Sequence, residues 1–338
     1  MDKKIIFDKK NVIVAGGAGF IGSHLCDELI EKAKVICIDN FSTGSEKNID
    51  HLLSNPDFIF INHDLSEPID LEKIESLEKF KISFQGVQEI YNLACPMSPN
   101  GFNKNKLNII NANSLVVKNL LDIATKYESK FMQFSSSVVY GFKREELGDY
   151  QVNETDMGQV STINERSCYD EGKRFAETLV YNYREQNHID AKIVRIFRTF
   201  GPRMTLDDGQ MIPDMVASAL EGKDIEIYGD ENFSSSLCYV SDTIDGVTKF
   251  MESDLAGPFN IGSDIDVNIT DLAKKIIEAT GSNSKIVHKE SKIFMTPLLT
   301  PDIYKARNEL GWMPITTLNN GIEKTIFDLQ ARKRLRKM

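Results

Sequence analysis

Short apolar runs rich in β-branched residues alternate with amphipathic stretches over the first 200 residues of the chain. The amphipathic stretches have the apolar spacing of helices, and the short runs have the length of buried strands. This alternation predicts an α/β fold of the Rossmann type, with a doubly wound parallel sheet and helices on both faces. The predicted strands are Asn11–Ala15, Val35–Ile38, Phe58–Asn62, Glu89–Ala94, Lys130–Ser135 and Ala191–Ile196.

The pattern changes after Gly201-Pro202, where polar loops carry Asp207-Asp208-Gly209 and Tyr228-Gly229-Asp230. A helix is predicted near Thr270–Thr280. Ligands of open α/β sheets sit at the carboxyl ends of the strands, so a smaller C-terminal lobe there would bind the substrate. We expect residues 1–200 to form the sheet domain, with residues 236–262 returning to it, and residues 201–235 and 263–338 to form the lobe.

The composition narrows the possible partners. A formal net charge of -10 argues against nucleic acid, whose phosphates are held by clustered Lys and Arg. The five cysteines are odd in number and form no CxxC pair, and the five histidines form no metal-binding pattern. Neither a signal peptide nor a membrane span is evident in the sequence. We therefore expect a cytoplasmic protein with no metal, nucleic-acid or membrane partner.

A glycine motif follows the first predicted strand. Val12–Ala15 leads into Gly16-Gly17-Ala18-Gly19-Phe20-Ile21-Gly22, and the next strand ends in Asp39. Glycines allow a tight turn and close approach to a pyrophosphate, and an acidic residue about twenty positions later accepts the ribose hydroxyls of a dinucleotide. Asp39 would repel a 2′-phosphate, and Asn40 and Phe41 follow it rather than an arginine, so NAD(H) is predicted over NADP(H).

Asp64 follows the strand Phe58–Asn62 and is a candidate contact of the adenine, with Leu65 beside it. A turn-forming aspartate is the alternative reading of Asp64. The predicted cofactor contacts are Gly16, Gly19, Phe20, Ile21, Gly22, Asp39, Asn40, Asp64 and Leu65, together with Tyr169 and Lys173.

Tyr169 and Lys173 lie four residues apart and would share one face of a helix. A free tyrosine has a pKa of about 10, which is too high for a base at neutral pH. A nearby ammonium favours the phenolate and lowers that pKa. We predict that Tyr169 takes the proton of a substrate hydroxyl while hydride leaves the same carbon for the cofactor.

Ser135-Ser136-Ser137 lies at the end of a predicted strand. A hydroxyl at the carboxyl end of a strand can hydrogen-bond the oxygen that is being oxidised, so Ser136 and Ser137 are predicted catalytic residues. A turn or a helix cap is the alternative for any single serine, and above all for Ser135.

With these residues the chain resembles the extended short-chain dehydrogenase/reductase family, also called the NAD-dependent epimerase/dehydratase family. The resemblance covers nearly the whole chain and is greatest to the UDP-glucuronate decarboxylase branch. The strings that carry it are Asn92-Leu93-Ala94-Cys95-Pro96-Met97-Ser98-Pro99, Glu165-Arg166-Ser167-Cys168-Tyr169-Asp170-Glu171-Gly172-Lys173-Arg174, Arg195-Ile196-Phe197, Thr199-Phe200-Gly201-Pro202-Arg203-Met204, Asp207-Asp208-Gly209 and Pro301-Asp302-Ile303.

The resemblance implies an enzyme that retains its NAD(H) and oxidises C4 of the sugar in a nucleoside-diphosphate sugar. Ser136, Tyr169 and Lys173 would be the catalytic groups. Members of the family are commonly homo-oligomers, so a dimer or tetramer is expected. The expected substrate contacts are Pro96, Arg198, Arg203, Gln210, Tyr228 and Ser235.

The chain departs from the decarboxylase pattern at four places. Val138 stands where that branch has a glutamate that assists the steps after C4 oxidation, and valine has no titratable group. Ser235 stands where the branch has an arginine, whereas Arg198 stands at a position that is usually asparagine. Leu298-Leu299-Thr300 replaces basic residues. Our hypothesis is that Arg198 supplies the missing guanidinium and binds the diphosphate.

The sequence therefore favours C4 oxidation without elimination, by a nucleotide-sugar 4-dehydrogenase or by a 4-epimerase that returns the hydride. A UDP-glucuronate decarboxylase in which another group replaces the glutamate is the first alternative. A non-catalytic NAD(H) sensor is the second.

Overall fold

The computed structural model describes residues 9–142, 148–206, 208–229, 232–290 and 298–336, with the backbone alone for residues 334–336. The chain divides into two compact units. Unit 1 comprises Met1–Pro96, Asn108–Phe134 and Phe175–Ile193, and unit 2 comprises Met97–Leu107, Ser135–Arg174 and Val194–Met338.

The strands are β1 (Lys10–Ala15), β2 (Ala33–Asp39), β3 (Phe58–Asn62), β4 (Glu89–Asn92), β5 (Lys130–Ser136), β6 (Gln151–Val152), β7 (Ala191–Ile196), β8 (Thr199–Phe200), β9 (Ile225–Tyr228), β10 (Ser234–Ser236), β11 (Cys238–Tyr239), β12 (Phe259–Ile261), β13 (Asp266–Asn268), β14 (Ile286–Lys289) and β15 (Thr300–Pro301).

The α-helices are α1 (Phe20–Ile30), α2 (Ile82–Gln85), α3 (Phe102–Asn113), α4 (Leu115–Tyr127), α5 (Ser167–Asn187), α6 (Met211–Leu220), α7 (Val240–Glu252), α8 (Ile269–Thr280), α9 (Tyr304–Glu309) and α10 (Leu318–Arg336). The 3₁₀ helices are η1 (Glu46–Asn48), η2 (Asp50–Leu52), η3 (Leu71–Lys73), η4 (Glu75–Phe80) and η5 (Ser137–Tyr140).

Within the described residues, seven strands form one sheet in the order β12-β7-β5-β4-β1-β2-β3. The pairs β1–β2, β1–β4, β2–β3, β4–β5 and β7–β12 all have parallel register. This sheet confirms the predicted doubly wound fold, and each of the six predicted strands is present. The fourth strand ends at Asn92 rather than at Ala94, because the Ala94 N–H turns back to the Asn92 side chain.

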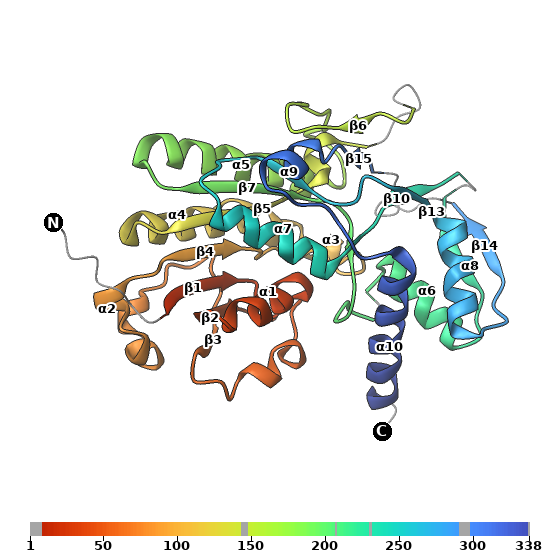
Figure 1. Cartoon of the computed structure of the whole chain (residues 1–338), viewed down its shortest axis with the longest axis horizontal. Helices are drawn as coiled ribbons and strands as arrows, with labels where there is room; N and C mark the ends of the chain where they lie inside the picture. Colours follow the sequence, from red (N-terminus) through yellow and green to blue (C-terminus); the bar gives the residue numbers. More distant parts are fainter. Residues whose placement is uncertain (1–8, 143–147, 207, 230–231, 291–297, 337–338) are drawn as a thin grey trace. The chain divides into compact units, whose positions relative to one another are not determined.

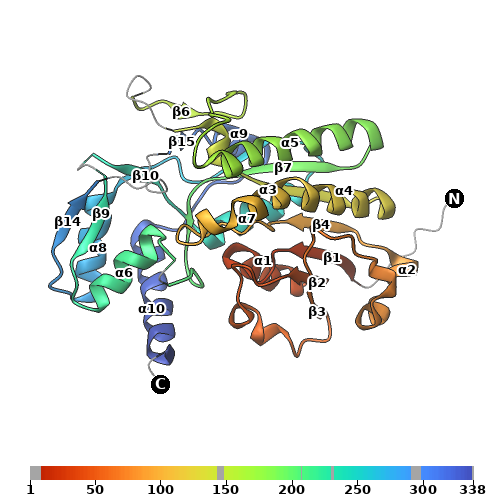
Figure 2. The ribbon, with the colours of Figure 1, turned by 180° about the vertical axis from the view of Figure 1, so that it is seen from behind.

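The two faces of the sheet in unit 1 are buried by different helices. Ile13 and Ile36 belong to one hydrophobic core with Leu120 of α4 and Val180 of α5. The alternate strand residues, such as Val12, face the other way and are also fully buried. Figure 1 shows α1 in front of β1 and β2, and Figure 2 shows α4 in front of the strands from the opposite side. Burial on both faces explains why these strands are continuous apolar runs.

Unit 2 contains short paired strands and several helices. The strands β9 and β14 pair in parallel, and β10 pairs antiparallel with β13. Helix α8 confirms the helix predicted near Thr270–Thr280. It begins after Asn268, whose side chain accepts the N–H groups of Thr270 and Asp271. It ends at Thr280 and is followed by Gly281 in the left-handed conformation. Helices α6 and α8 pack against each other and against β9 (Figure 1).

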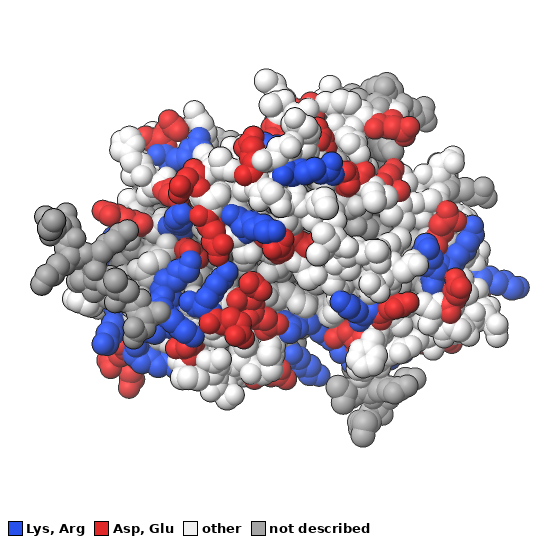
Figure 3. All heavy atoms as spheres, viewed as in Figure 1, with Lys and Arg blue, Asp and Glu red and all other residues white. Residues whose placement is uncertain are grey.

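Acidic and basic side chains are interspersed on the face of the molecule in Figure 3, without a large area of one sign among the coloured atoms. None of the helices in the part of the chain that the structure describes combines the length and the apolar character of a membrane span. Among the same residues, no three His, Cys, Asp or Glu side chains are grouped as metal ligands. All five cysteines are free thiols.

Candidate cofactor and active site

The glycine loop begins directly after β1 and is closely packed. Gly16 has a φ of +78°, and a Cβ on it would lie 2.9 Å from the backbone nitrogen of Ala94. A Cβ on Gly22 would lie 2.2 Å from the carbonyl oxygen of Gly16. Because backbone atoms are in the way at both places, neither position has room for a side chain.

Helix α1 starts at Phe20, directly after the loop. Gly19 is its N-cap residue and makes no side-chain capping bond, and the first turn contains no acidic residue. The first N–H groups of a helix have no acceptor within the helix, and they carry its partial positive charge. The N–H groups of this turn, including those of Phe20 and Ile21, are thus suited to an anion such as a pyrophosphate.

Asp39 ends β2 and is only 8% exposed. Its Oδ2 accepts the N–H of Ala18 at 3.0 Å, and its Oδ1 accepts the N–H of Phe41 at 2.8 Å. Burial raises the pKa of this carboxyl, and the two backbone hydrogen bonds partly oppose that rise. A carboxylate offers about four lone-pair positions, so Asp39 keeps acceptor capacity for ribose hydroxyls.

Two other predicted adenosine contacts lie together. The Asn40 amide donates to the Asp64 carboxylate at 3.3 Å, and the Ser66 N–H donates to the same carboxylate at 2.9 Å. The bond from the Ser66 N–H is the largest cause of the lowered pKa of Asp64. Leu65 is buried in the core of unit 1, where its carbonyl accepts from Asn119. Unit 1 therefore brings Asn40 and Asp64 together and turns the Leu65 side chain inward.

The groups in unit 1 fit a dinucleotide. The loop has glycine where a Cβ would collide with backbone, the helix start is uncapped, and a buried carboxylate stands at the end of the second strand. Gly16, Gly19 and Gly22 with the start of α1 would hold the pyrophosphate, and Asp39 would hold the ribose.

Ser136 is the last residue of β5 and the N-cap of η5. Its Oγ accepts the N–H of Val138 at 3.4 Å, so a serine expected to be catalytic also caps a helix. Accepting this bond leaves the hydroxyl proton of Ser136 available to a ligand oxygen. Ser135 and Ser137 are both buried on either side of it.

Tyr169 and Lys173 share helix α5, as the spacing predicts. The Lys173 Nζ lies 5.9 Å from the centre of the Tyr169 ring, and the lysine is buried. Arg174 links this part of α5 to η5, because its Nη1 donates to the Val139 carbonyl at 2.9 Å. The helix that carries Tyr169 and the turn that follows Ser136 are thus joined within unit 2.

A buried ion pair flanks Tyr169. Arg166 Nη2 donates to Asp170 Oδ1 at 2.9 Å, and both side chains are buried. Burial raises the pKa of Asp170, and the Arg166 charge opposes that rise. Since Tyr169 lies between the two partners in sequence, the pair fixes the first turn of α5.

Val138 is only 4% exposed and lies in η5. The turn is held at its end by Tyr140, whose hydroxyl donates to Asn260 Oδ1 at 2.7 Å and accepts from Arg195 at 2.8 Å. Burial raises the pKa of Tyr140 to about 12. Tyr140 therefore stays a neutral phenol at neutral pH and acts as a structural anchor.

Arg198 follows β7 and lies close to Arg166. Burial and the positive charge of Arg166 lower the pKa of its guanidinium to about 10, so it remains protonated at neutral pH. Among the described residues no carboxylate pairs with it, and its Nη1 lies 4.0 Å from the Met211 sulfur. Arg198 is half-buried, and a cation in such a place favours an anionic partner.

Two loops of unit 2 meet at Asp208. Its carboxylate accepts from the hydroxyl of Ser98 and, at 3.1 Å, from the Gln210 amide. Gln210 is also the residue that precedes α6. Asp207 and Asp230, in the loops singled out from the sequence, lie outside the described residues.

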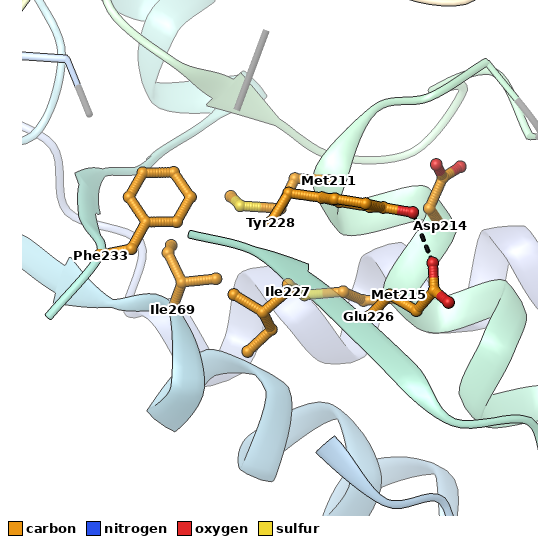
Figure 4. Close-up of a pocket in the computed structure, with 8 residues that line it drawn as sticks. All are labelled: Met211, Asp214, Met215, Glu226, Ile227, Tyr228, Phe233 and Ile269. Carbon is orange, nitrogen blue, oxygen red and sulfur yellow. Dashed lines mark hydrogen bonds between the residues drawn. The ribbon is translucent and has the colours of Figure 1, made fainter. Parts of the chain in front are cut away.

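Tyr228 lines a pocket of about 280 Å³, part of it open to solvent. Its hydroxyl donates to the Glu226 carboxylate, whereas Phe233 and Ile269 lie on the other side of the pocket (Figure 4). The pocket is lined by Met211, Asp214, Met215, Glu226, Ile227, Tyr228, Phe233 and Ile269.

The remaining predicted substrate contacts are not among the residues that line this pocket. Ser235 is buried in β10, and its hydroxyl donates to the Ser236 carbonyl at 3.4 Å. Arg203 has a φ of 67°, and its N–H donates to Asp328. Pro96 is buried at the end of a segment of unit 1.

A model of the NAD dependent epimerase/dehydratase family matches residues 12–262. The chain belongs to this family. It is 39% identical to UDP-glucuronic acid decarboxylase 1 of Arabidopsis thaliana over 322 residues. The matched region covers 95% of this chain and 70% of that relative. These matches confirm the family expected from the sequence motifs.

Two solved structures are also similar to this chain. The UDP-glucose 4-epimerase of Thermotoga maritima, in a structure with UDP-glucose, has a TM-score of 0.82 and 26% identity over 96% of this chain and 99% of that one. The UDP-glucuronic acid 4-epimerase of Bacillus cereus, in complex with UDP-glucuronic acid and NAD, has a TM-score of 0.81 and 27% identity over 95% and 99%.

Membership of an NAD dependent family confirms the prediction that NAD(H) is the cofactor. It also confirms an enzyme of the short-chain dehydrogenase/reductase type. The roles of the individual site residues, and the predicted boundaries of the lobe, stay predictions.

Sequence reasoning did not single out several polar contacts at the site. Asn260 and Arg195 anchor Tyr140 from strands distant in sequence, and Ser98 meets Asp208 across 110 positions. The Asn48 amide likewise donates to the Ala18 carbonyl, 30 positions away. A lone polar residue gives no sequence signal for a distant partner, so these contacts could be found only from the folded chain.

Replacing Gly22 with alanine tests the fit of the glycine loop. The new Cβ would lie 2.2 Å from the Gly16 carbonyl oxygen, so the loop would have to move. A displaced loop would bind the pyrophosphate of the cofactor more weakly. We expect NADH affinity to fall by roughly two orders of magnitude, as 2–3 kcal/mol of overpacking at the loop implies. Fluorescence titration with NADH measures this change.

Gly222→Ala is the matched control, because it also changes a glycine, yet no atom lies within 4 Å of the added Cβ. An alanine at the φ of 66° of this position should lower the stability of the fold somewhat, but it should leave the NADH affinity unchanged. Normal NADH binding by Gly22→Ala would show that the loop does not hold the pyrophosphate.

Proposed function

We propose that this enzyme oxidises C4 of a nucleoside-diphosphate sugar to a ketone and catalyses neither elimination nor decarboxylation. It would act as a 4-dehydrogenase, or as a 4-epimerase if the hydride is returned to the other face of the sugar. The observation that carries this proposal is the buried, apolar Val138 in the turn after Ser136.

The chemistry after C4 oxidation distinguishes the candidate reactions. Elimination of a hydroxyl needs proton transfer at C5, and a side chain at position 138 can take part only if it titrates. Valine cannot. Tyr140 lies in the same turn, but its pKa of about 12 keeps it a neutral phenol, and its hydroxyl already donates to Asn260. It therefore cannot replace a carboxylate.

The residues kept by the chain are those that C4 oxidation requires. The phenolate of Tyr169 takes the proton of the C4 hydroxyl, and Ser136 donates a hydrogen bond to the same oxygen. The charge of Lys173 favours the phenolate. NAD+ supplies the acceptor for the hydride that leaves C4. One proton and one hydride leave, so the sugar is oxidised by two electrons and keeps all of its carbon atoms.

Two similar solved structures support this proposal, since both are named 4-epimerases of UDP sugars. The relatives of higher identity are named UDP-glucuronic acid decarboxylases, and decarboxylation is therefore the main alternative. It would require another group to take over from the missing glutamate.

A panel of nucleotide sugars tests the function, with NADH absorbance to detect net oxidation and product analysis to detect an epimer. We expect one or more sugars to give a 4-keto or epimerised product, and UDP-glucuronate to release no carbon dioxide. Tyr169→Phe should lower turnover by about 10² to 10⁴, the usual loss when a proton-transfer group is removed, and should still bind NADH.

Three results would change the conclusion. Carbon dioxide release from UDP-glucuronate would identify a decarboxylase. Unchanged turnover in Tyr169→Phe would remove the proposed base. No oxidation of any sugar by a protein that binds NADH would favour the non-catalytic sensor.

Arg198 is the best candidate for binding the diphosphate. Its guanidinium lacks a carboxylate partner among the described residues, and Met211 beside it also lines the pocket that contains Tyr228. A cation next to a pocket with aromatic and methionine walls is suited to a nucleotide, whose phosphates need charge and whose base needs flat apolar surface. We infer that the diphosphate contacts Arg198 and that the base enters this pocket.

Arg198→Ala should lower the affinity for UDP at least tenfold, because a charge-assisted hydrogen bond is worth about 1.5–3 kcal/mol. Calorimetric titration of UDP measures the change. Arg307→Ala is the control, since Arg307 is exposed and already paired with Asp264 at 3.0 Å. Equal affinity of Arg198→Ala and the wild type would refute the assignment.

A further inference from the structure

The peptide groups on both sides of Ala18 are held by a segment outside the glycine motif. The Ala18 N–H donates to Asp39 Oδ2 at 3.0 Å. The Ala18 carbonyl accepts two hydrogen bonds, from the Ser45 N–H at 3.0 Å and from the Asn48 amide at 2.9 Å. The segment from Asp39 to Asn48 therefore closes around the middle of the loop.

These contacts fix the orientation of the loop. The peptide that joins Ala18 to Gly19 is held at its carbonyl by Ser45 and Asn48, and at its N–H by the Gly16 carbonyl at 3.2 Å. Since a peptide group is planar, holding both ends leaves it little freedom to rotate. The residue that follows is the first of α1, whose N–H groups suit the pyrophosphate.

Asn48 is the one side chain among these three partners of the Ala18–Gly19 peptide. It lies at the end of η1 and is buried, although its neighbours Glu46 and Lys47 are exposed. Its Nδ2 donates to Ala18, and its Oδ1 is buried with no hydrogen-bond partner in the described part of the chain. The amide is thus held through its donor end, and the donated bond is its contribution to the loop.

We propose that Asn48 is a positioning residue of the NAD site, whose amide holds the Ala18 carbonyl and keeps the glycine loop in the shape that receives the pyrophosphate. This role concerns the cofactor alone. It holds whichever sugar the enzyme oxidises, and it can be tested with no sugar present.

The dissociation constant of NADH is measured by fluorescence on protein freed of nucleotide. Asn48→Ala removes the donor and should raise the constant about tenfold, the usual effect of one buried hydrogen bond. Lys47→Ala is the control from the same turn, and it should bind NADH as the wild type does.

Asn48→Asp keeps the shape of the side chain and replaces the donor with an acceptor. At neutral pH its carboxylate would face the Ala18 carbonyl, so the dissociation constant should rise more than in Asn48→Ala. A protonated carboxyl donates a hydrogen bond, and the difference from the wild type should therefore shrink as the pH falls toward about 5.

Other charged groups near the loop do not explain such a pH response. Asp39 faces Ala18 from β2, and Glu46, Lys47 and Asp50 lie exposed on the adjacent turns. All four remain in the wild type and in both variants of Asn48, so their titration cancels when the profiles are compared.

A role in stability alone predicts a different result. The unfolding temperature of the protein without cofactor would fall, while the NADH dissociation constant of the folded variant would stay that of the wild type. An unchanged NADH dissociation constant in Asn48→Ala overturns the proposal. An Asn48→Asp variant with the same NADH dissociation constant as Asn48→Ala at every pH overturns it as well. Should Asn48→Asp fail to fold, the Asn48→Ala titration decides the question.

Discussion

The close approach of helix α1 to the loop before it is the constraint on which the cofactor site depends. At Gly22 the helix leaves no room for a Cβ against the Gly16 carbonyl, and at Gly16 the backbone takes a positive φ against the start of the segment after β4. The approach brings an uncapped helix start to the carboxyl end of β1, and the buried Asp39 carboxylate then binds the Ala18 N–H. The close backbone packing at the two glycines thus determines where the polar groups of the cofactor site lie.

Charged side chains shape the predicted active site around Tyr169. Arg166 is compensated by Asp170, whereas Arg198 has no carboxylate partner among the residues that the structure describes. The ion pair fixes the turn that carries Tyr169, and the uncompensated guanidinium remains for an anionic ligand. In our proposal the enzyme keeps the proton-transfer residues of its family, holds the diphosphate with Arg198, and has lost at Val138 the group that would carry the reaction past the ketone.

Much of the fold was predictable from the sequence because strands buried on both faces must be apolar throughout. All six predicted strands and the helix near Thr270–Thr280 are present. The seventh strand, Phe259–Ile261, is too short to stand out from a loop, and its partner β7 lies some sixty residues earlier. The cofactor motif was predictable for a related reason, since its glycines and Asp39 lie within one strand-helix-strand unit. By contrast, Asn48 and Asn260 act through partners distant in sequence, and no local pattern marks them.

Isotope tracing tests the central claim most directly. A nucleoside-diphosphate sugar that the enzyme oxidises is labelled with deuterium at C4, and both products are examined by mass spectrometry. We predict that the deuterium passes from C4 to the nicotinamide and that the sugar keeps every carbon atom. If the ketone is released, the deuterium is found on the nicotinamide, and if the ketone is reduced again, the deuterium is found at C4 of the epimer. A ketone formed without deuterium on the nicotinamide, or a sugar product that has lost its carboxyl carbon, would contradict the proposal.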